Sequence, residues 1–403
     1  MKRYILSKED LLFDLRIAYY KAIEHKSSEP YVIDFEKNLD ENLLQLADEL
    51  YSHTYKPEPS NCFIINHPKI REIFAANFRD RIVHHLYFYY LHELFESTFI
   101  QDSYSCIKNR GTHYGIERLE HHIREESHNF QEECYVLKMD IKGYFMNINR
   151  QLLCDIVIKV FDRMQHHLVS KNSKVKWSEI IDFEFVTYLT KEIALLDPSI
   201  NCIIKSPLSM WDGLPLSKSL LHTPNGCGLP IGNLTSQLFS NVFLNILDQY
   251  MKRTLKCKHY GRYVDDFFVV SKDKEFIKSI IPKIEHFLKN ELQLDINKGK
   301  TKILKVHQGV EYLGAFLKPF RNYISNQSLS RIYRQLFSEK GHRSVESINS
   351  FLGILSHYHS FNIRKEICEK LNLHEIGVCD ANYTKFKPFE SFKLQPLINI
   401  LNE

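Results

Sequence analysis

The sequence predicts an α+β protein in which strands and helices alternate around an antiparallel sheet. A short apolar run over residues 135–139 ends on Asp140, as expected for a strand that delivers one carboxylate at its end. Asp265 and Asp266 lie between two apolar stretches, which indicates a β-hairpin with both carboxylates at its tip. Residues 328–370 carry helical spacing alone. Together these observations place a sheet in the middle of the chain and a helical unit after it.

Local sequence justifies the elements that precede the sheet. Ser7 with Asp10 resembles a capping box ahead of an apolar helical pattern, and Pro57 and Pro59 end a second helical pattern. The expected elements are helices at 7–26 and 41–52, a strand at 62–65 with a turn at 66–68, and helices at 78–96 and 113–127.

The second half continues the alternation. We expect helices at 150–168, 233–254 and 274–291, each with an apolar face, and an insertion at 170–227 whose polar start suggests a mobile loop. Beyond residue 374 basic residues alternate with aromatic ones: Lys385, Lys387 and Lys393 with Tyr383, Phe386, Phe389 and Phe392. This tail either holds a single-stranded nucleic acid or packs its aromatic rings on the preceding helices.

Two adjacent aspartates on a hairpin are difficult to explain by structure alone, because they repel each other and strands disfavour Asp. A divalent cation most often offsets that repulsion, and Mg²⁺ prefers carboxylate oxygens. With Asp140 as a third carboxylate, the pattern is that of a phosphoryl-transfer centre with paired ions about 4 Å apart. Taken singly, Asp140 could instead be a helix cap or turn residue, and Asp265 with Asp266 an Asx turn.

Several blocks, in order, resemble the conserved blocks of reverse transcriptases. Asp140 with its aromatic tail and Tyr263-Val264-Asp265-Asp266 are similar to the catalytic motifs of that family. The other similar blocks are residues 78–85, 102–113, 294–302 and 311–314. The resemblance covers about residues 60–360.

One block narrows the resemblance to the reverse transcriptases of diversity-generating retroelements. In residues 228–237, Ile231 takes a position where most reverse transcriptases have Gln, and Gln237 takes a Pro position. Residues 211–219 and 347–355 are also similar to this subfamily. The resemblance implies an RNA-directed DNA polymerase that copies a template RNA with frequent errors opposite adenines, for mutagenic retrohoming.

The resemblance also implies a right-hand polymerase fold with fingers, a palm and a helical thumb. The expected units are an N-terminal helical extension at 1–59, fingers at 60–134, a palm at 135–320 that includes a second finger segment and the insertion at about 170–227, a thumb at 321–373 and a tail at 374–403.

The expected cofactor is a pair of Mg²⁺ ions, for which Mn²⁺ is a possible substitute. Asp140 and Asp265 are expected to bridge both ions, and the Ile141 carbonyl is expected to help hold the nucleotide-side ion. Asp266 is expected to contribute negative charge, and possibly a ligand, on the primer side.

Further residues carry expected roles in nucleotide and primer binding. Lys69 and Arg71 are candidates to clamp the triphosphate or are an ordinary charged turn, and Phe145 is either the gate against a 2′-hydroxyl or a core residue. Arg79, Asp80 and Arg81 either pair internally or touch the template. The remaining candidates are Ile231, Gly232, Gln237 and Lys300 for the nucleotide, and Tyr263, Tyr312, Leu313 and Gly314 for the primer and template.

Composition limits the partners and the location. A net charge of +4 means that nucleic acid must be held by a local positive groove. The expected partners are template RNA, a DNA primer and dNTPs, and the resemblance implies a basic oligomeric accessory protein. Nine scattered cysteines, with no leader-like start and no membrane-spanning run, fit a reducing cytoplasm. A metal role for the adjacent histidine pairs is not expected, because no Cys or carboxylate recurs around them with ligand spacing.

Two alternatives remain at the level of sequence. A retron-type or phage-defence reverse transcriptase is one, although neither a retron's Val-Thr-Gly signature nor a maturase or endonuclease domain is recognisable. The other is a non-catalytic RNA-binding scaffold, against which the intact Asp140, Asp265 and Asp266 argue.

Overall fold

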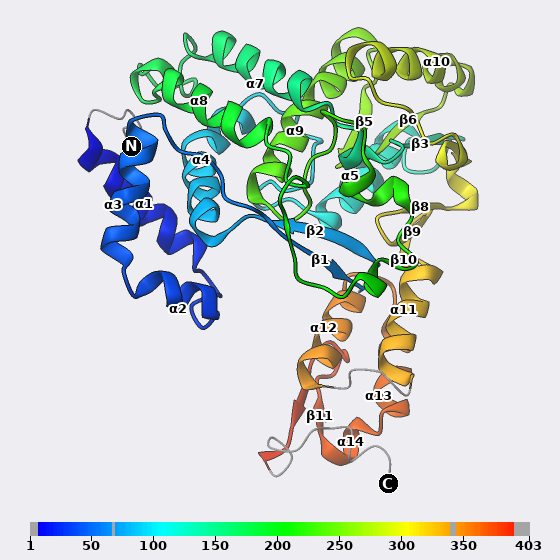
Figure 1. The fold of residues 1–403 in the computed structure, drawn as a ribbon. Coiled ribbons are helices and arrows are strands. Elements are labelled where there is room, and N and C mark those ends of the chain that lie inside the picture. The colour runs from blue at the N-terminus through cyan, green and yellow to red at the C-terminus, as the bar shows by residue number, and fades with distance from the viewer. Residues whose placement is uncertain (1–6, 67–68, 339–343, 391–403) are drawn as a thin grey trace.

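The computed structural model describes residues 7–66, 69–338 and 344–390. The fold is α+β, as predicted, with a central antiparallel sheet, helices on both of its faces and a helical thumb that projects away from it (Figure 1). The turn expected at 66–68 lies partly outside the described residues. Among the described residues, no helix combines the length and apolarity needed to cross a bilayer.

The N-terminal extension is helical and packs on the fingers. It comprises α1 (Lys8–Ala22), α2 (Pro30–Glu36) and α3 (Leu39–Tyr51), and α1 lies against α4 (Phe78–Glu96). Ser7 caps α1 by accepting from the Asp10 amide at 3.2 Å, as the capping pattern predicts. The Tyr90 hydroxyl on α4 donates to the buried carboxylate of Asp14 on α1 at 2.6 Å, and this hydrogen bond joins the two helices.

A small sheet forms the tip of the fingers. Strand β1 (Asn61–Ile65) pairs antiparallel with β2 (Arg71–Ala75), and β4 (Ile203–Ile204) adds to β1 in parallel. Glu72 on β2 is buried, and it accepts bonds from Trp211 Nε1 at 2.7 Å and from Ser219 Oγ at 2.8 Å. The segment around residues 208–220 is therefore fastened to the fingers by one carboxylate.

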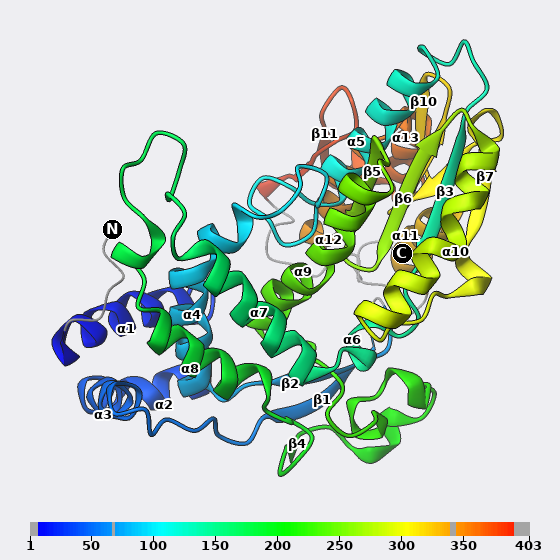
Figure 2. The ribbon, with the colours of Figure 1, turned by 90° about the horizontal axis from the view of Figure 1, so that it is seen from above.

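The palm sheet has the strand order β5-β6-β3-β7, and each neighbouring pair is antiparallel (Figure 2). The strands, in this order, are His259–Tyr263, Asp266–Ser271, Tyr135–Asp140 and Lys302–Lys305. Alternation along β6 explains the two layers. Phe267 and Val269 join the main core, whereas Phe268 and Val270 face a second cluster with α5 (Thr112–Glu126).

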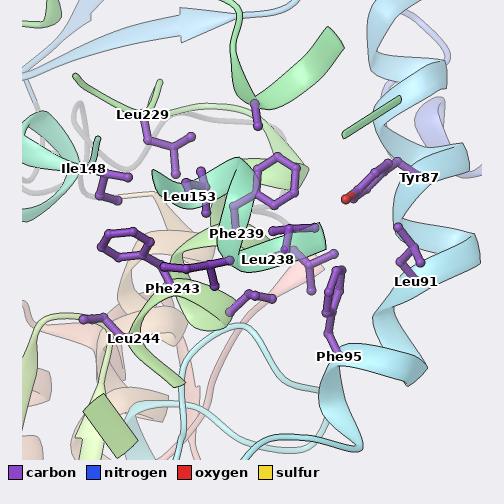
Figure 3. Packing of buried hydrophobic residues seen from close by; sticks show 14 of the residues in the cluster. Tyr87, Leu91, Phe95, Ile148, Leu153, Leu229, Leu238, Phe239, Phe243 and Leu244 are labelled. Atoms are coloured by element: carbon purple, nitrogen blue, oxygen red, sulfur yellow. The ribbon is translucent and has the colours of Figure 1, made fainter. Parts of the chain in front are cut away.

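Helices fill the main core beside the sheet. The helices are α6 (Tyr144–Asn147), α7 (Arg150–Met164), α9 (Leu234–Gln249) and α10 (Lys274–Glu291). Figure 3 shows Phe239 and Phe243 of α9 among these apolar side chains, with Tyr87, Leu91 and Phe95 presented by α4. The rings of Tyr87 and Phe239 meet edge to face at 5.4 Å. Helix α9 is buried on nearly every side because it crosses the middle of this core.

The segment at 170–227, expected as an insertion that begins with a mobile loop, packs in part into the main core. Residues 169 and 175 close its polar loop through a backbone bond of 3.0 Å, and α8 (Phe183–Ala194) then buries Phe185, Val186 and Leu189 in the main core. The polar composition of the loop concealed the amphipathic helix that follows it.

The thumb begins with a strand, which corrects the expectation of a helical unit from residue 321. Strands β8 (Val310–Tyr312), β9 (Ala315–Lys318) and β10 (Arg321–Ile324) form a sheet with the order β10-β9-β8. The following elements are α11 (Asn326–Phe337), α12 (Val345–Ser356), α13 (Phe361–Lys370), α14 (Leu373–Ile376), β11 (Gly377–Cys379) and β12 (Phe386–Pro388).

The tail favours the packing alternative. Phe386 is buried in the thumb core, and its backbone amide and carbonyl bond the side chain of Asn349 on α12. Phe392 and Lys393 lie outside the described residues. Short 3-10 turns at 177–179, 208–211, 216–218, 220–222, 298–300 and 306–308, and a π-helical turn at 250–254, complete the fold.

A buried ion pair joins the palm sheet to α9. The Arg262 guanidinium on β5 donates to both carboxylate oxygens of Asp248, at 2.7 and 2.6 Å, and neither side chain is exposed to solvent. The Tyr260 hydroxyl donates to the same carboxylate at 2.6 Å. A third guanidinium bond, to the Val264 carbonyl at 3.0 Å, reaches the turn that carries Asp265.

Replacing Asp248 by Asn should therefore destabilise the protein strongly, because the charge of Arg262 would stay buried without its partner. Removing one member of a buried pair costs about 3–5 kcal/mol. We expect a large fall in the apparent Tm in a thermal melt. Asp40→Asn, which removes the partner of Arg16 on the surface, is the matched control and should leave the Tm unchanged. Equal effects of the two changes would contradict the importance given to the buried pair.

Candidate active site

Strand pairing brings the three predicted carboxylates to one end of the palm sheet. Asp140, the last residue of β3, is the ladder partner of Asp266, the first residue of β6. Asp265 lies in the turn between β5 and β6, and its carbonyl accepts a bond from the Ile141 amide at 3.3 Å. Two strand ends and one tight turn therefore create the cluster, although 125 residues separate Asp140 from Asp265 along the chain.

The turn itself is under backbone strain. Val264 adopts φ of +53°, a left-handed conformation that a β-branched residue rarely takes. The bond from Arg262 to the Val264 carbonyl holds this conformation in place. Such strain persists only where surrounding contacts enforce it, and it is common at functional sites.

The cluster has more negative charge than its own surroundings neutralise. Burial raises the pKa of Asp265 to about 6, and the neighbouring carboxylate of Asp140 adds to the rise. Burial also raises the pKa of Asp266 above its usual value. A group whose ionised form is this unfavourable gains from a nearby cation, which fits a site for divalent metal ions.

Lys300 forms an ion pair with Asp140. Its Nζ lies 3.0 Å from both carboxylate oxygens of Asp140, while its side chain remains 64% exposed. Asn297 Nδ2 donates to Asp140 at 3.2 Å and the Asn297 amide donates to the Asp140 carbonyl at 2.8 Å. The sequence predicts Lys300 near the triphosphate, but nothing in it indicates the contact of Lys300 with Asp140 or the bonds from Asn297.

Phe145 and Ile231, both predicted nucleotide contacts, pack against the same small cluster. Both are half-buried beside Cys62 and Phe74, which come from the finger strands. The Phe145 carbonyl accepts from the Leu229 amide at 2.8 Å, and the Ile231 carbonyl accepts from the Phe74 amide at 3.0 Å. One apolar cluster therefore links α6, which follows β3, to the loop before α9.

Gly232 fits its position for a steric reason. Its φ is +128°, and a Cβ there would lie 2.8 Å from Ile73 Cγ2 and 3.3 Å from the Phe74 carbonyl oxygen on β2. Only glycine allows this approach of loop and strand. Close by, Gln237 is exposed and lines a pocket of about 570 Å³ with Gly232, Ile73 and Arg81.

The charged finger residues divide between two roles. Arg79 and Asp80 pair with each other, and Arg79 also pairs with Glu49, as the internal alternative predicts. Arg81 instead lies over the Tyr31 ring at 4.8 Å and borders the pocket beside Gln237. Lys69 and Arg71 are exposed and form no ion pair with the part of the chain that the structure describes, so their triphosphate role stays a prediction.

The predicted primer contacts need one correction. Tyr312 is fully buried beneath the sheet, edge to face with Phe268 at 5.2 Å, so its side chain cannot touch a primer. Leu313 and Gly314, half-exposed with φ of +48° and +87°, form the turn above it. Tyr263 is half-buried at the end of β5. Primer contact at residues 312–314 would therefore come from the turn rather than from the tyrosine.

Comparison with known proteins agrees with this geometry. The family model described as "Reverse transcriptase (RNA-dependent DNA polymerase)" matches residues 64–317, which include all three carboxylates. The chain belongs to the reverse transcriptase family. Family membership makes it an RNA-directed DNA polymerase, and the matched region runs from the fingers through the palm to β9.

Individual relatives of this reverse transcriptase are distant. Protein YkfC of Escherichia coli (strain K12) is 24% identical over 341 residues, 76% of this chain and 78% of that protein. The group II intron-encoded protein LtrA of Lactococcus lactis subsp. cremoris is 23% identical over 302 residues, 68% of this chain and 49% of LtrA. The alignment therefore spans about half the length of LtrA.

Solved structures show only a general likeness. Apo telomerase from Candida tropicalis has a TM-score of 0.49 and 13% identity, covering 86% of this chain and 62% of that one. Telomerase from Candida albicans, solved with a fragment of telomeric RNA, has a TM-score of 0.48 and 10% identity, covering 81% and 56%.

The raised pKa of Asp265 predicts a pH-dependent stability. Its folded-state pKa of about 6 exceeds the unfolded value of ~3.9, so the stability of the metal-free protein falls as the pH rises through that window. Asp265→Asn removes this ionisation. In EDTA the variant should therefore have a higher Tm than the wild type above pH 6, and the difference should disappear near pH 4.

The same melts in Mg²⁺ complete the test, because Mg²⁺ should raise the Tm of the wild type more than the Tm of Asp265→Asn. Asp155→Asn, at an exposed carboxylate on α7, is the control and should show neither effect. A lower Tm for Asp265→Asn in EDTA at neutral pH would contradict the electrostatic account.

Proposed function

We propose that this reverse transcriptase makes adenine-mutagenic cDNA from a template RNA, using two Mg²⁺ ions at Asp140, Asp265 and Asp266, within a diversity-generating retroelement. The single observation that supports catalysis is the convergence of the three carboxylates at one end of the palm sheet. Two of them, Asp265 and Asp266, have raised pKa values, and a bound cation would offset the unfavourable negative charge that these values reflect.

The residues have distinct tasks in this proposal. Asp140, Asp265 and the Ile141 carbonyl would hold the two ions, and Asp266 would supply negative charge on the primer side. Bound Mg²⁺, or Mn²⁺ in its place, lowers the pKa of the primer 3′-hydroxyl and offsets charge on the triphosphate.

Lys300 has two partners in this proposal. Without metal ions it pairs with Asp140, and its exposed side chain would turn toward the triphosphate when metal ions bind that carboxylate. Lys69 and Arg71 add positive charge from the fingers, where they would contact the triphosphate. The turn at Leu313 and Gly314 would contact the primer. Positive groups around a transferring phosphate stabilise the charge that develops on it.

The retroelement assignment depends on the loop before α9. Ile231 presents an apolar side chain in the cluster that also contains Phe145, so it adds shape but no hydrogen bond to the nucleotide surroundings. A site without polar discrimination separates correct from incorrect pairs less well. Gln237, exposed at the neighbouring pocket, completes the block that resembles this subfamily.

The proposed partners are template RNA, a DNA primer, dNTPs and a basic oligomeric accessory protein. Large apolar side chains are exposed on the N-terminal helices, at Phe13, Tyr20 and Leu44, and they offer contact area that a monomer does not use. Purified accessory protein should raise the cDNA yield from the cognate RNA. All nine cysteines are free thiols, which supports a cytoplasmic location that cell fractionation checks.

Asp265→Asn should abolish polymerisation while the fold persists, because the change keeps the volume and removes the metal-binding charge. Loss of this charge stabilisation should lower the primer-extension rate by at least ~10³-fold. Asp155→Asn, an exposed control, should extend the primer at the wild-type rate. Near wild-type extension by Asp265→Asn would refute the assignment of Asp265 to the metal site, whereas no extension by the wild type would favour a non-catalytic scaffold.

Phe145→Ala should increase the use of ribonucleotides relative to deoxynucleotides, since removing the ring relieves the clash with a 2′-hydroxyl. Incorporation efficiencies for both nucleotide types measure this ratio. Tyr144→Phe is the control, because it keeps the neighbouring buried ring and loses only a bond to the Ser240 carbonyl. An unchanged ratio in Phe145→Ala would mean that Phe145 serves only the core.

Ile231→Gln should lower misincorporation opposite adenine more than opposite other bases, because the amide restores a hydrogen bond near the nascent pair. One such bond, at ~1.4 kcal/mol, corresponds to a tenfold change in selectivity. Sequencing of cDNA made on one template measures the effect, and Ile231→Leu should keep the wild-type error pattern. Equal adenine error rates in Ile231→Gln and wild type would place the source of errors elsewhere.

A further inference from the structure

Two buried histidines meet at the end of the palm sheet remote from the three aspartates. His122 on α5 and His259 on β5 are 4% and 3% exposed, and their Nδ1 atoms lie 3.1 Å apart although 137 residues separate them in sequence. Figure 2 shows α5 alongside β5. His259 pairs with Val270, whereas Tyr263 pairs with Asp266 at the opposite end of the same ladder.

The far side of each ring faces a carboxylate. His122 Nε2 lies 3.3 Å from Asp102 Oδ2, and His259 Nε2 lies 3.2 Å from Glu126 Oε2. Neither Nε2 makes a well-aligned hydrogen bond in the described part of the chain. The Nδ1–Nδ1 contact admits two arrangements: one ring donates a proton from Nδ1 to the other, or each ring carries its proton on Nε2, toward its carboxylate, and turns the lone pair of Nδ1 toward the other ring.

In the second arrangement the two Nδ1 lone pairs repel each other unless a cation lies between them. Two imidazole nitrogens that bind one tetrahedral zinc ion, at 2.0–2.1 Å each, are about 3.3 Å apart. The observed Nδ1–Nδ1 separation of 3.1 Å is therefore close to that of two ligands of one ion. A carboxylate behind each ring is also the usual support of a metal-bound histidine.

Glu125 supplies a third ligand. It is three residues after His122 on the same helix, and its Oε2 lies 4.0 Å from His259 Nδ1. One ligand atom from each of the three residues can be chosen so that all lie within 4.8 Å of one another. Because Glu125 is partly exposed, a fourth position is accessible to water.

The alternative to a metal ion is a proton shared between the two Nδ1 atoms. In that alternative one neutral ring donates an N–H···N hydrogen bond to the other across the 3.1 Å between the two Nδ1 atoms. The surrounding charges are mixed: Asp102 already pairs with Arg118 and lies near Lys252, and Glu125 pairs with Lys258 and lies near His121.

We propose that His122, Glu125 and His259 bind one zinc-type divalent ion that fastens helix α5 to strand β5. Imidazole nitrogen selects zinc and its neighbours among the transition metals over Mg²⁺, so the site would not compete for the catalytic ions. The ion would anchor the start of the strand whose other end carries Tyr263 and the catalytic turn.

The test uses the full chain, stripped with a chelator and dialysed into excess Mg²⁺ so that the aspartate site is occupied. Zn²⁺ content after gel filtration, and the visible absorption of added Co²⁺, should report one four-coordinate ion per chain. His259→Asn and Glu125→Gln should weaken binding beyond the ~10–100-fold that loss of an outer partner costs.

His121→Asn is the matched control, since His121 is an exposed neighbour on the same helix, and it should keep the ion. Glu125→Gln keeps the test informative if the buried histidine variant does not fold. Wild-type protein without a bound ion, or binding that survives both ligand changes, would overturn the proposal in favour of the shared proton.

Discussion

The buried pair between Arg262 and Asp248 is the interaction on which the catalytic end of the palm depends. A guanidinium without solvent contact is tolerated only when its donors are satisfied, and here they reach Asp248, the Val264 carbonyl and Ser103. These bonds connect α9, the strained turn before Asp265 and the segment before α5. The position of the three carboxylates therefore depends on a buried charge that lies behind them.

The nucleotide side depends on a second connection, between fingers and palm. Gly232 allows the loop before α9 to lie against β2, and the Ile231 carbonyl bonds the Phe74 amide there. Glu72 on the same strand holds Trp211 and Ser219. Because both connections meet on β2, any movement of the fingers would also move the apolar surface formed by Phe145 and Ile231.

The palm sheet thus places two chemically different clusters at its two ends. Three clustered carboxylates suit hard ions that retain phosphate and water ligands, whereas paired imidazoles suit a softer ion. Strand β5 runs between the two clusters, and its buried side chains are packed from both faces. Such separation allows one fold to use different metals without exchange between sites.

The amino-acid sequence by itself determined the α+β class, most helix positions and the three carboxylates, because periodicity, caps and adjacent aspartates are local features. Tertiary structure decided what only folding brings together: the burial of Tyr312, the contact of Lys300 with Asp140, and the helix α8 after a polar loop. It also decided the meeting of His122 with His259, which adjacent histidine pairs in the sequence could not indicate. The physical reason is that the pairing of β3 with β6 and the contacts of Lys300 and His122 depend on partners more than a hundred residues away along the chain.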